Sequence, residues 1–176
     1  MFDEDTTWLH QVHGASVVSV TKPGEHAGVE ADAAVTRVRG VKLAVRTADC
    51  VPVVLVADDA IGVVHAGWRG LAGGILQKTI AELGSVGRAY LGPHIRVGCY
   101  EFGVADLDEV AGALGDGVRG TTLWGAPALD LTAGVRAALG DIPVHDTGAC
   151  TACGDVYFSW RARRETGRFA TIAWMS

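Results

Sequence analysis

Residues 43–70 read LAVRTADCVPVVLVADDAIGVVHAGWRG, and this stretch decides the expected fold class. It holds three apolar runs rich in β-branched residues, at Leu43–Arg46, Val53–Val56 and Ile61–Val64. Short runs of this kind predict buried central strands, and Asp58-Asp59 predicts a turn between the last two. After His65, the sequence Ala-Gly-Trp-Arg-Gly leads toward a helix, so a strand is expected to feed a loop and then a helix.

Apolar patterns typical of strands and of helices recur on both sides of this stretch. Apolar residues at helical spacing predict a helix over 71–83, which Gly84 should end. Further strands are expected at 15–20, 33–38, 89–91 and 169–174, and further helices at 105–114 and 132–139. Thr132 is the expected N-cap of the last helix and Gly140 its end. The pattern predicts one mixed α/β domain over residues 1–176.

The composition and charge of the chain limit the kinds of binding partner that are expected. The 176 residues are about half apolar and one fifth charged, as in a compact globular protein. The formal charge of −5 contains no block of like charge, which argues against a nucleic-acid groove or an anionic membrane surface. The acidic start does not resemble a signal peptide, and the longest apolar run, Val51–Ala57, is too short to span a bilayer. We therefore expect a cytoplasmic protein with a small-molecule partner.

The four cysteines do not suggest a disulfide framework, because a chain of this size has enough apolar residues for a core. Cys150-Thr-Ala-Cys153 has the spacing of half a zinc ribbon, but the second pair of ligands at matching spacing is missing. These two thiols are better interpreted as packing residues.

Three residues that can bind zinc lie at the ends of expected elements: His13, Cys50 and His65. Imidazole and thiolate are ligands that zinc prefers, and three protein ligands with one open position are typical of catalytic zinc sites. A single histidine at a strand end is more often a hydrogen-bonded core residue. Spacing alone therefore leaves both interpretations open.

Other polar residues near these motifs suggest substrate binding. Arg69 follows His65 in a glycine-containing loop, where a guanidinium and exposed amides suit a phosphate, although a surface arginine is about equally expected. Asp49 precedes Cys50 and is either a proton shuttle, a residue that orients the ligand, or a turn-forming aspartate. Of the C-terminal arginines, Arg161 is the first candidate for an anion, and a solvated basic face is the alternative.

Motifs along nearly the whole chain resemble the laccase-domain family, once called multicopper polyphenol oxidases and now understood as purine nucleoside phosphorylases. They are Gln11-Val-His-Gly14, Ala31-Asp-Ala33, Thr47-Ala-Asp-Cys-Val-Pro52, His65-Ala-Gly-Trp-Arg-Gly70, Leu91-Gly-Pro93, Cys99-Tyr-Glu-Phe-Gly103, Cys150-Thr151, Phe158-Ser-Trp-Arg161 and Thr166-Gly-Arg168. The resemblance implies a four-layer α-β-β-α sandwich with mixed sheets. It also implies that His13, Cys50 and His65 hold zinc.

The resemblance further implies phosphorolysis of adenosine, inosine and methylthioadenosine, with accompanying adenosine deaminase activity. Phosphorolysis needs a cationic phosphate pocket and an acid for the departing base, for which Arg69 and Arg161, and then Asp49, are the candidates. Cys50 and His65 are expected to be catalytic through the metal. Family members usually carry an additional N-terminal segment with a glycine-rich Thr-Arg motif. This sequence starts just ahead of Gln-Val-His-Gly, which affects expected activity more than metal binding.

Three alternatives compete with this interpretation. Multicopper oxidase chemistry requires many imidazoles, and the chain has six histidines, so copper is less expected than zinc. A similar arrangement of cysteine and histidine in cytotoxic necrotizing factors suggests a metal-free deamidase, with Cys50 as nucleophile and His65 as base. The third alternative is a metal-stabilised interaction domain without activity. The preferred nucleoside and the oligomeric state do not follow from the sequence.

Overall fold

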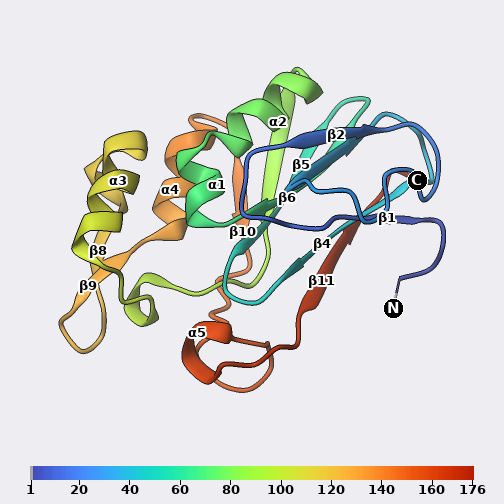
Figure 1. Ribbon diagram of the computed structural model, residues 1–176. Coiled ribbons are helices and arrows are strands. Elements are labelled where there is room, and N and C mark those ends of the chain that lie inside the picture. Colours follow the sequence, from blue (N-terminus) through green and yellow to red (C-terminus); the bar gives the residue numbers. More distant parts are fainter. Residues whose placement is uncertain (1) are drawn as a thin grey trace.

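The computed structural model describes residues 2–176 and is organised around a six-stranded mixed sheet (Figure 1). Its strands, in spatial order, are β10 (Val144–Asp146), β7 (Val86–Leu91), β5 (Val51–Ala57), β6 (Ile61–Ala66), β3 (Ala33–Thr36) and β2 (Val17–Val20). β5 is antiparallel to both β6 and β7, and β3 is antiparallel to β6. The valine-rich runs therefore form the central strands, as predicted, and Asp58-Asp59 lies in the tight connection between β5 and β6.

A smaller sheet packs against one face of this sheet. It contains β1 (Thr6–Trp8), β4 (Lys42–Thr47) and β11 (Phe169–Ala173), with β4 in the middle. Buried apolar side chains from both sheets fill the space between them, among them Leu43, Val45 and Val63. Exposing these apolar faces to water would be unfavourable, so the two sheets stack face to face.

Helices cover the opposite face of the six-stranded sheet (Figure 1). α1 (Trp68–Ala72) and α2 (Ile75–Leu83) contact the sheet directly, and α3 (Val104–Leu114) and α4 (Leu131–Leu139) pack against α1. Shorter elements complete the described chain: the 3-10 turns η1 (Val97–Cys99) and η2 (Asp116–Val118), the hairpin β8 (Arg119–Thr121) with β9 (Pro127–Leu129), and α5 (Trp160–Arg163). The mixed α/β class is confirmed, and residues 2–176 show the α-β-β part of the implied four layers.

Two details of the helices differ from the sequence prediction. The helix expected over 71–83 is interrupted, because Gly74 has a left-handed φ of 78° and separates α1 from α2. The N-cap of α4 is Asp130, whose carboxylate accepts a hydrogen bond from the Ala133 N–H at 2.9 Å. Thr132 instead uses its hydroxyl to contact His94 Nε2 at 2.9 Å, so it is not available as a cap. Within the described residues, no helix is both long enough and apolar enough to cross a membrane.

Candidate metal centre

The pairing of β5 with β6 brings Cys50 and His65 to the same edge of the large sheet. Pro52 pairs with His65 and Val51 with Ala66, so the start of β5 lies beside the end of β6. Cys50 directly precedes β5. Two residues that are 15 positions apart in sequence therefore meet because the hairpin between them is antiparallel.

Asp32 brings the third residue, His13, to the same place. The buried Asp32 carboxylate accepts hydrogen bonds from the N–H groups of Val12, His13 and Gly14, at 3.2, 3.0 and 2.8 Å. The backbone of His13 has a φ of 60°, which is unfavourable for a residue with a side chain. Three hydrogen bonds to one carboxylate hold the loop in this conformation, and such stored strain is common at functional sites.

The side chains of His13, Cys50 and His65 converge. One donor atom from each lies within 4.8 Å of the other two, and the imidazole rings meet edge to face. His65 Nδ1 lies 2.7 Å from Asp32 Oδ1. A proton on Nδ1 donated to the carboxylate leaves Nε2 free as a ligand, which is how a carboxylate orients a metal-binding histidine. The residues fit a metal ion with three protein ligands.

Glycines in the His-Ala-Gly-Trp-Arg-Gly segment make this approach possible. A Cβ at Gly67 would lie 3.0 Å from the His13 ring and 3.3 Å from Cys50 Sγ. A Cβ at Gly70 would lie 2.8 Å from the Gly14 carbonyl oxygen. The glycines therefore allow the loop before α1 to pass close to two of the ligands, as the sequence pattern indicated.

The three side chains strongly affect each other's protonation. Burial raises the pKa of the Cys50 thiol, but His65 and His13 outweigh it and lower the value to about 6. Burial lowers the pKa of His65, but Cys50 and Asp32 raise it to about 9. A thiolate beside an imidazolium is thus favoured near neutral pH in the protein without metal. The thiolate is the form of cysteine that binds a metal.

A cavity of about 630 Å³ opens over the three ligands. Its cationic side chains come from Arg46, Arg69, Arg161 and Arg168, and its aromatic side chains from Trp68, Tyr100 and Trp160. Thr47 also lines it, and the buried Thr47 hydroxyl has no hydrogen-bond partner among residues 2–176. The cavity therefore combines ligands for a metal, positive charge and flat apolar surfaces.

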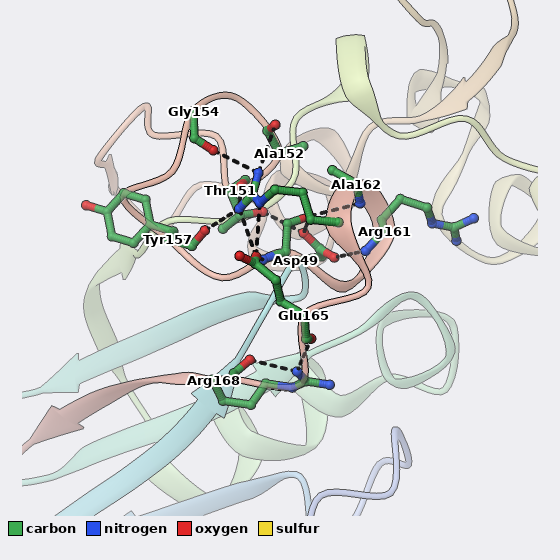
Figure 2. A network of polar contacts seen from close by, with 12 residues as sticks. Asp49, Thr151, Ala152, Gly154, Tyr157, Arg161, Ala162, Glu165 and Arg168 are labelled. Carbon is green, nitrogen blue, oxygen red and sulfur yellow. Dashed lines mark hydrogen bonds and ion pairs between the residues drawn. The ribbon is translucent and has the colours of Figure 1, made fainter.

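Asp49 lies in this cavity wall, but its carboxylate is already engaged (Figure 2). One oxygen accepts hydrogen bonds from the hydroxyls of Thr151 and Ser159, and the other from the backbone N–H of Arg161, all at 2.7 Å. Its φ of 90° marks it as the turn residue ahead of Cys50. This geometry favours a positioning role, one of the readings that the sequence left open. A role in proton transfer stays a prediction.

The predicted arginines have separate places in the structure. Arg69 and Arg161 both reach the cavity, where the Arg69 guanidinium lies 4.0 Å from the Trp68 ring and the Arg161 guanidinium 4.9 Å from the Tyr100 ring. Arg163 instead donates hydrogen bonds to carbonyl groups of the loop before α5, including that of Gly154 at 2.8 Å. A cation that stabilises a loop in this way is not available to an anion in the cavity.

Several residues of the site have no role that the sequence alone indicates. Asp32 orients His65 and the His13 loop, and its only signal was a carboxylate between two alanines at the start of an apolar strand. Arg46 and Tyr100 reach the cavity from β4 and from the segment after η1. No sequence spacing indicated this, because only the stacking of the sheets and the loops above them brings these residues together.

The chain is similar over its whole length to a known protein family. The family model described as multi-copper polyphenol oxidoreductase laccase matches residues 1–176. The chain belongs to this family. The purine nucleoside phosphorylase ORF3 of Streptomyces griseus is 42% identical to it over 96% of this chain and 73% of that protein. The purine nucleoside phosphorylase of Xylella fastidiosa strain Temecula1 is also 42% identical, over 96% and 71%.

Solved structures support the same assignment. YlmD from Geobacillus stearothermophilus superposes with a TM-score of 0.86 at 30% identity, covering 98% of this chain and 74% of that one. The protein NMB0706 of Neisseria meningitidis superposes with a TM-score of 0.85 at 35% identity, covering 97% and 74%. The resemblance stated from the motifs is therefore confirmed, together with the mixed α/β fold.

Proposed function

We propose that this protein is a zinc-dependent purine nucleoside phosphorylase that acts on adenosine, inosine and methylthioadenosine and also deaminates adenosine. One observation carries the proposal: His13, Cys50 and His65 converge at the floor of a cavity that also contains four arginines and three aromatic rings. The names of its relatives support the phosphorylase part. The deaminase activity and the cytoplasmic location stay predictions.

Zinc is the metal that suits this donor set. Two imidazoles and one thiolate are borderline-soft ligands of the kind found in catalytic zinc sites, with one coordination position left open. When bound, zinc supplies a Lewis acid and lowers the pKa of water. In residues 2–176 the centre brings together two histidines and one cysteine, which is too few imidazoles for a multinuclear copper cluster.

The remaining side chains of the cavity are assigned to phosphate binding, purine stacking and positioning. We assign phosphate binding to the guanidinium groups of Arg69 and Arg161, since both line the cavity and guanidinium matches phosphate geometry. The rings of Trp68 and Tyr100 offer flat surfaces against which a purine can stack. Asp49 holds the backbone of Arg161 through its second carboxylate oxygen, so in this proposal it fixes the phosphate pocket. It also stays the candidate acid for the departing base.

Incubation with adenosine tests the proposal. If it is correct, adenine and ribose 1-phosphate form only when phosphate is present, and removal of zinc abolishes both phosphorolysis and deamination. Arg69→Ala should raise the phosphate KM about tenfold or more with a smaller effect on deamination, because only phosphorolysis needs an anion pocket. The matched control is Arg88→Ala on β7, an exposed arginine outside the cavity, which should retain wild-type kinetics.

Other outcomes would overturn it. Amide hydrolysis by zinc-free protein, abolished by alkylation of Cys50, would favour the cysteine hydrolase. Bound zinc without any nucleoside turnover would favour the interaction domain. Full activity of both His13→Ala and His65→Ala would show that this centre is not the site of the reaction.

A further inference from the structure

A second group of metal-binding side chains lies outside the centre described above. Cys99 comes from η1, and Cys150 and Cys153 come from the loop after β10. The three sulfur atoms lie within 4.8 Å of one another, and Cys99 Sγ is 3.2 Å from Cys153 Sγ. All three cysteines are free thiols. The Cys-x-x-Cys pair thus acquires a third thiol from a residue 51 positions before Cys150, which sequence spacing did not indicate.

Backbone hydrogen bonds fix the two loops that carry these thiols. The His94 N–H donates to the Ala149 carbonyl at 3.3 Å, and the Thr151 N–H donates to the His94 carbonyl at 3.1 Å. The two segments therefore run side by side as a parallel bridge at His94 and Cys150. These contacts hold the two loops together, and the three thiols lie close to one another at this point.

The surroundings of Cys150 favour a thiolate. The Arg96 N–H donates to Cys150 Sγ at 3.4 Å. Backbone N–H groups directed at a sulfur stabilise its negative charge without adding a formal positive charge. A sulfur of this kind is suited to bind a cation.

We propose that Cys99, Cys150 and Cys153 form a second metal site, which takes Zn²⁺ through three thiolates. Zinc–sulfur bonds of about 2.3 Å place the sulfurs of a tetrahedral site about 3.8 Å apart. One sulfur pair of this cluster is 3.2 Å apart and no pair is more than 4.8 Å apart, so zinc needs only small side-chain movements. Each thiol that is still protonated releases its proton to solvent when zinc binds, and no electron transfer is needed.

The convergence of three sulfurs favours a metal over a disulfide. A disulfide would use two of the thiols and would require one sulfur pair to close from 3.2 Å to about 2.05 Å. It would leave Cys150 with its thiolate-stabilising N–H groups and no partner. The fourth position of the zinc ion is left to a second cavity of about 490 Å³, which is lined by Cys99, Glu101, Trp124 and Arg161. Arg161 lines both cavities, so the second site would brace one wall of the first.

Zinc content per chain tests this proposal. The full chain, purified under reducing conditions and equilibrated with Zn²⁺ followed by gel filtration, should hold two zinc ions by elemental analysis. Cys153→Ser should hold one, and so should Cys50→Ser, whereas the double variant should hold none. Val156→Ser is the matched control, because it changes an exposed side chain of the same loop and removes no thiol. It should keep two.

Cobalt gives a second readout that does not depend on stoichiometry alone. In the Cys50→Ser background, thiolate-to-cobalt charge-transfer absorption should remain and should disappear when Cys153→Ser is added. Wild-type protein with one zinc per chain and no loss in Cys153→Ser would overturn the proposal. So would a disulfide between Cys99 and Cys153 in freshly purified protein, seen by mass spectrometry of unreduced peptides. Circular dichroism of Cys153→Ser, an exposed position, checks that the variant folds.

Discussion

At the scale of single residues, the candidate metal centre depends on Gly67, a position with no side chain. Gly67 lies where a Cβ would come within 3.0 Å of the His13 ring and 3.3 Å of Cys50 Sγ. We predict that Gly67→Ala lowers the zinc affinity of this centre at least about tenfold, since disturbing the surroundings of metal ligands has effects of that size. Competition with a chromophoric chelator measures the affinity. Gly112→Ala is the control, because a Cβ there would contact no atom within 4 Å.

The surroundings of Cys50 and of Cys99 predict opposite reactivity for these two thiols in zinc-free protein. The thiolate of Cys50 should be largely formed above pH 6, because His65 and His13 lower its pKa to about 6 despite burial. Burial and the neighbouring thiols raise the pKa of Cys99 to about 12. Iodoacetamide should therefore modify Cys50 at a rate that levels off by about pH 7, while Cys99 stays slow throughout. Peptide mass spectrometry across pH separates the two, and equal pH profiles would contradict this assignment.

At the scale of elements, Asp49 connects the start of β5 to the segment before α5. Ser159 donates its hydroxyl hydrogen to Asp49 and accepts from the Ala162 N–H at the start of α5. Ser159→Ala removes both contacts, so we predict a loss of about 1–3 kcal/mol in the free energy of unfolding. The phosphate KM should also rise, because Arg161 belongs to the same network.

Urea unfolding and phosphate titration measure these two effects. The control is Ser85→Ala, an exposed serine in the turn before β7, which should change neither. A Ser159→Ala variant with wild-type stability would show that Asp49 does not depend on this hydroxyl.

Elements with a clear periodicity were predictable and the short ones were not. The central strands β5 and β6 and the helices α3 and α4 were predicted within a few residues, because their apolar residues recur over several turns or pairs. The three-residue strands β1, β8, β9 and β10 contain too few residues to show an alternation, and pairing alone defines them. β2 begins two residues later than predicted at 15–20, and β3 ends two residues earlier than predicted at 33–38, because their pairing covers only four residues of each.

The metal-binding residues of the candidate site could be proposed from the sequence, but the residues that hold them in place could not. His13, Cys50 and His65 were proposed as ligands from residue type and motif. The β5–β6 hairpin brings Cys50 and His65 together, and Asp32 holds the loop of His13 beside them. Asp32 and the cluster of Cys99 with Cys150 and Cys153 depend on contacts between distant segments. Sequence spacing carries no signal for such contacts, because each partner alone has an ordinary structural explanation.

At the scale of the whole molecule, the residues of both candidate metal centres lie at the ends of strands and in the segments beside them, outside the two hydrophobic clusters. The two hydrophobic clusters on either side of the large sheet are formed by apolar side chains. The sheet and its layers therefore provide a rigid frame, and the loops provide the chemistry. One ion pair, Arg96 with Asp146, joins the loop that carries Cys99 to β10 at the edge of this frame, and its strength can be measured through global stability.

The hydrogen bonds from Arg96 lower the pKa of Asp146 from an ordinary value of 3.8 to about 2. A lowered carboxyl pKa contributes stability that is fully present above the unfolded value and is lost as the pH falls toward 2. The shift corresponds to about 2 kcal/mol, so Asp146→Asn should lower the free energy of unfolding by about that amount at pH 7. The difference from wild type should shrink steadily between pH 4 and pH 2. Asp59→Asn, in the exposed pair with Arg37, is the control and should change stability by less than about 0.5 kcal/mol. A pH-independent difference for Asp146→Asn would mean that the residue acts through packing and not through its charge.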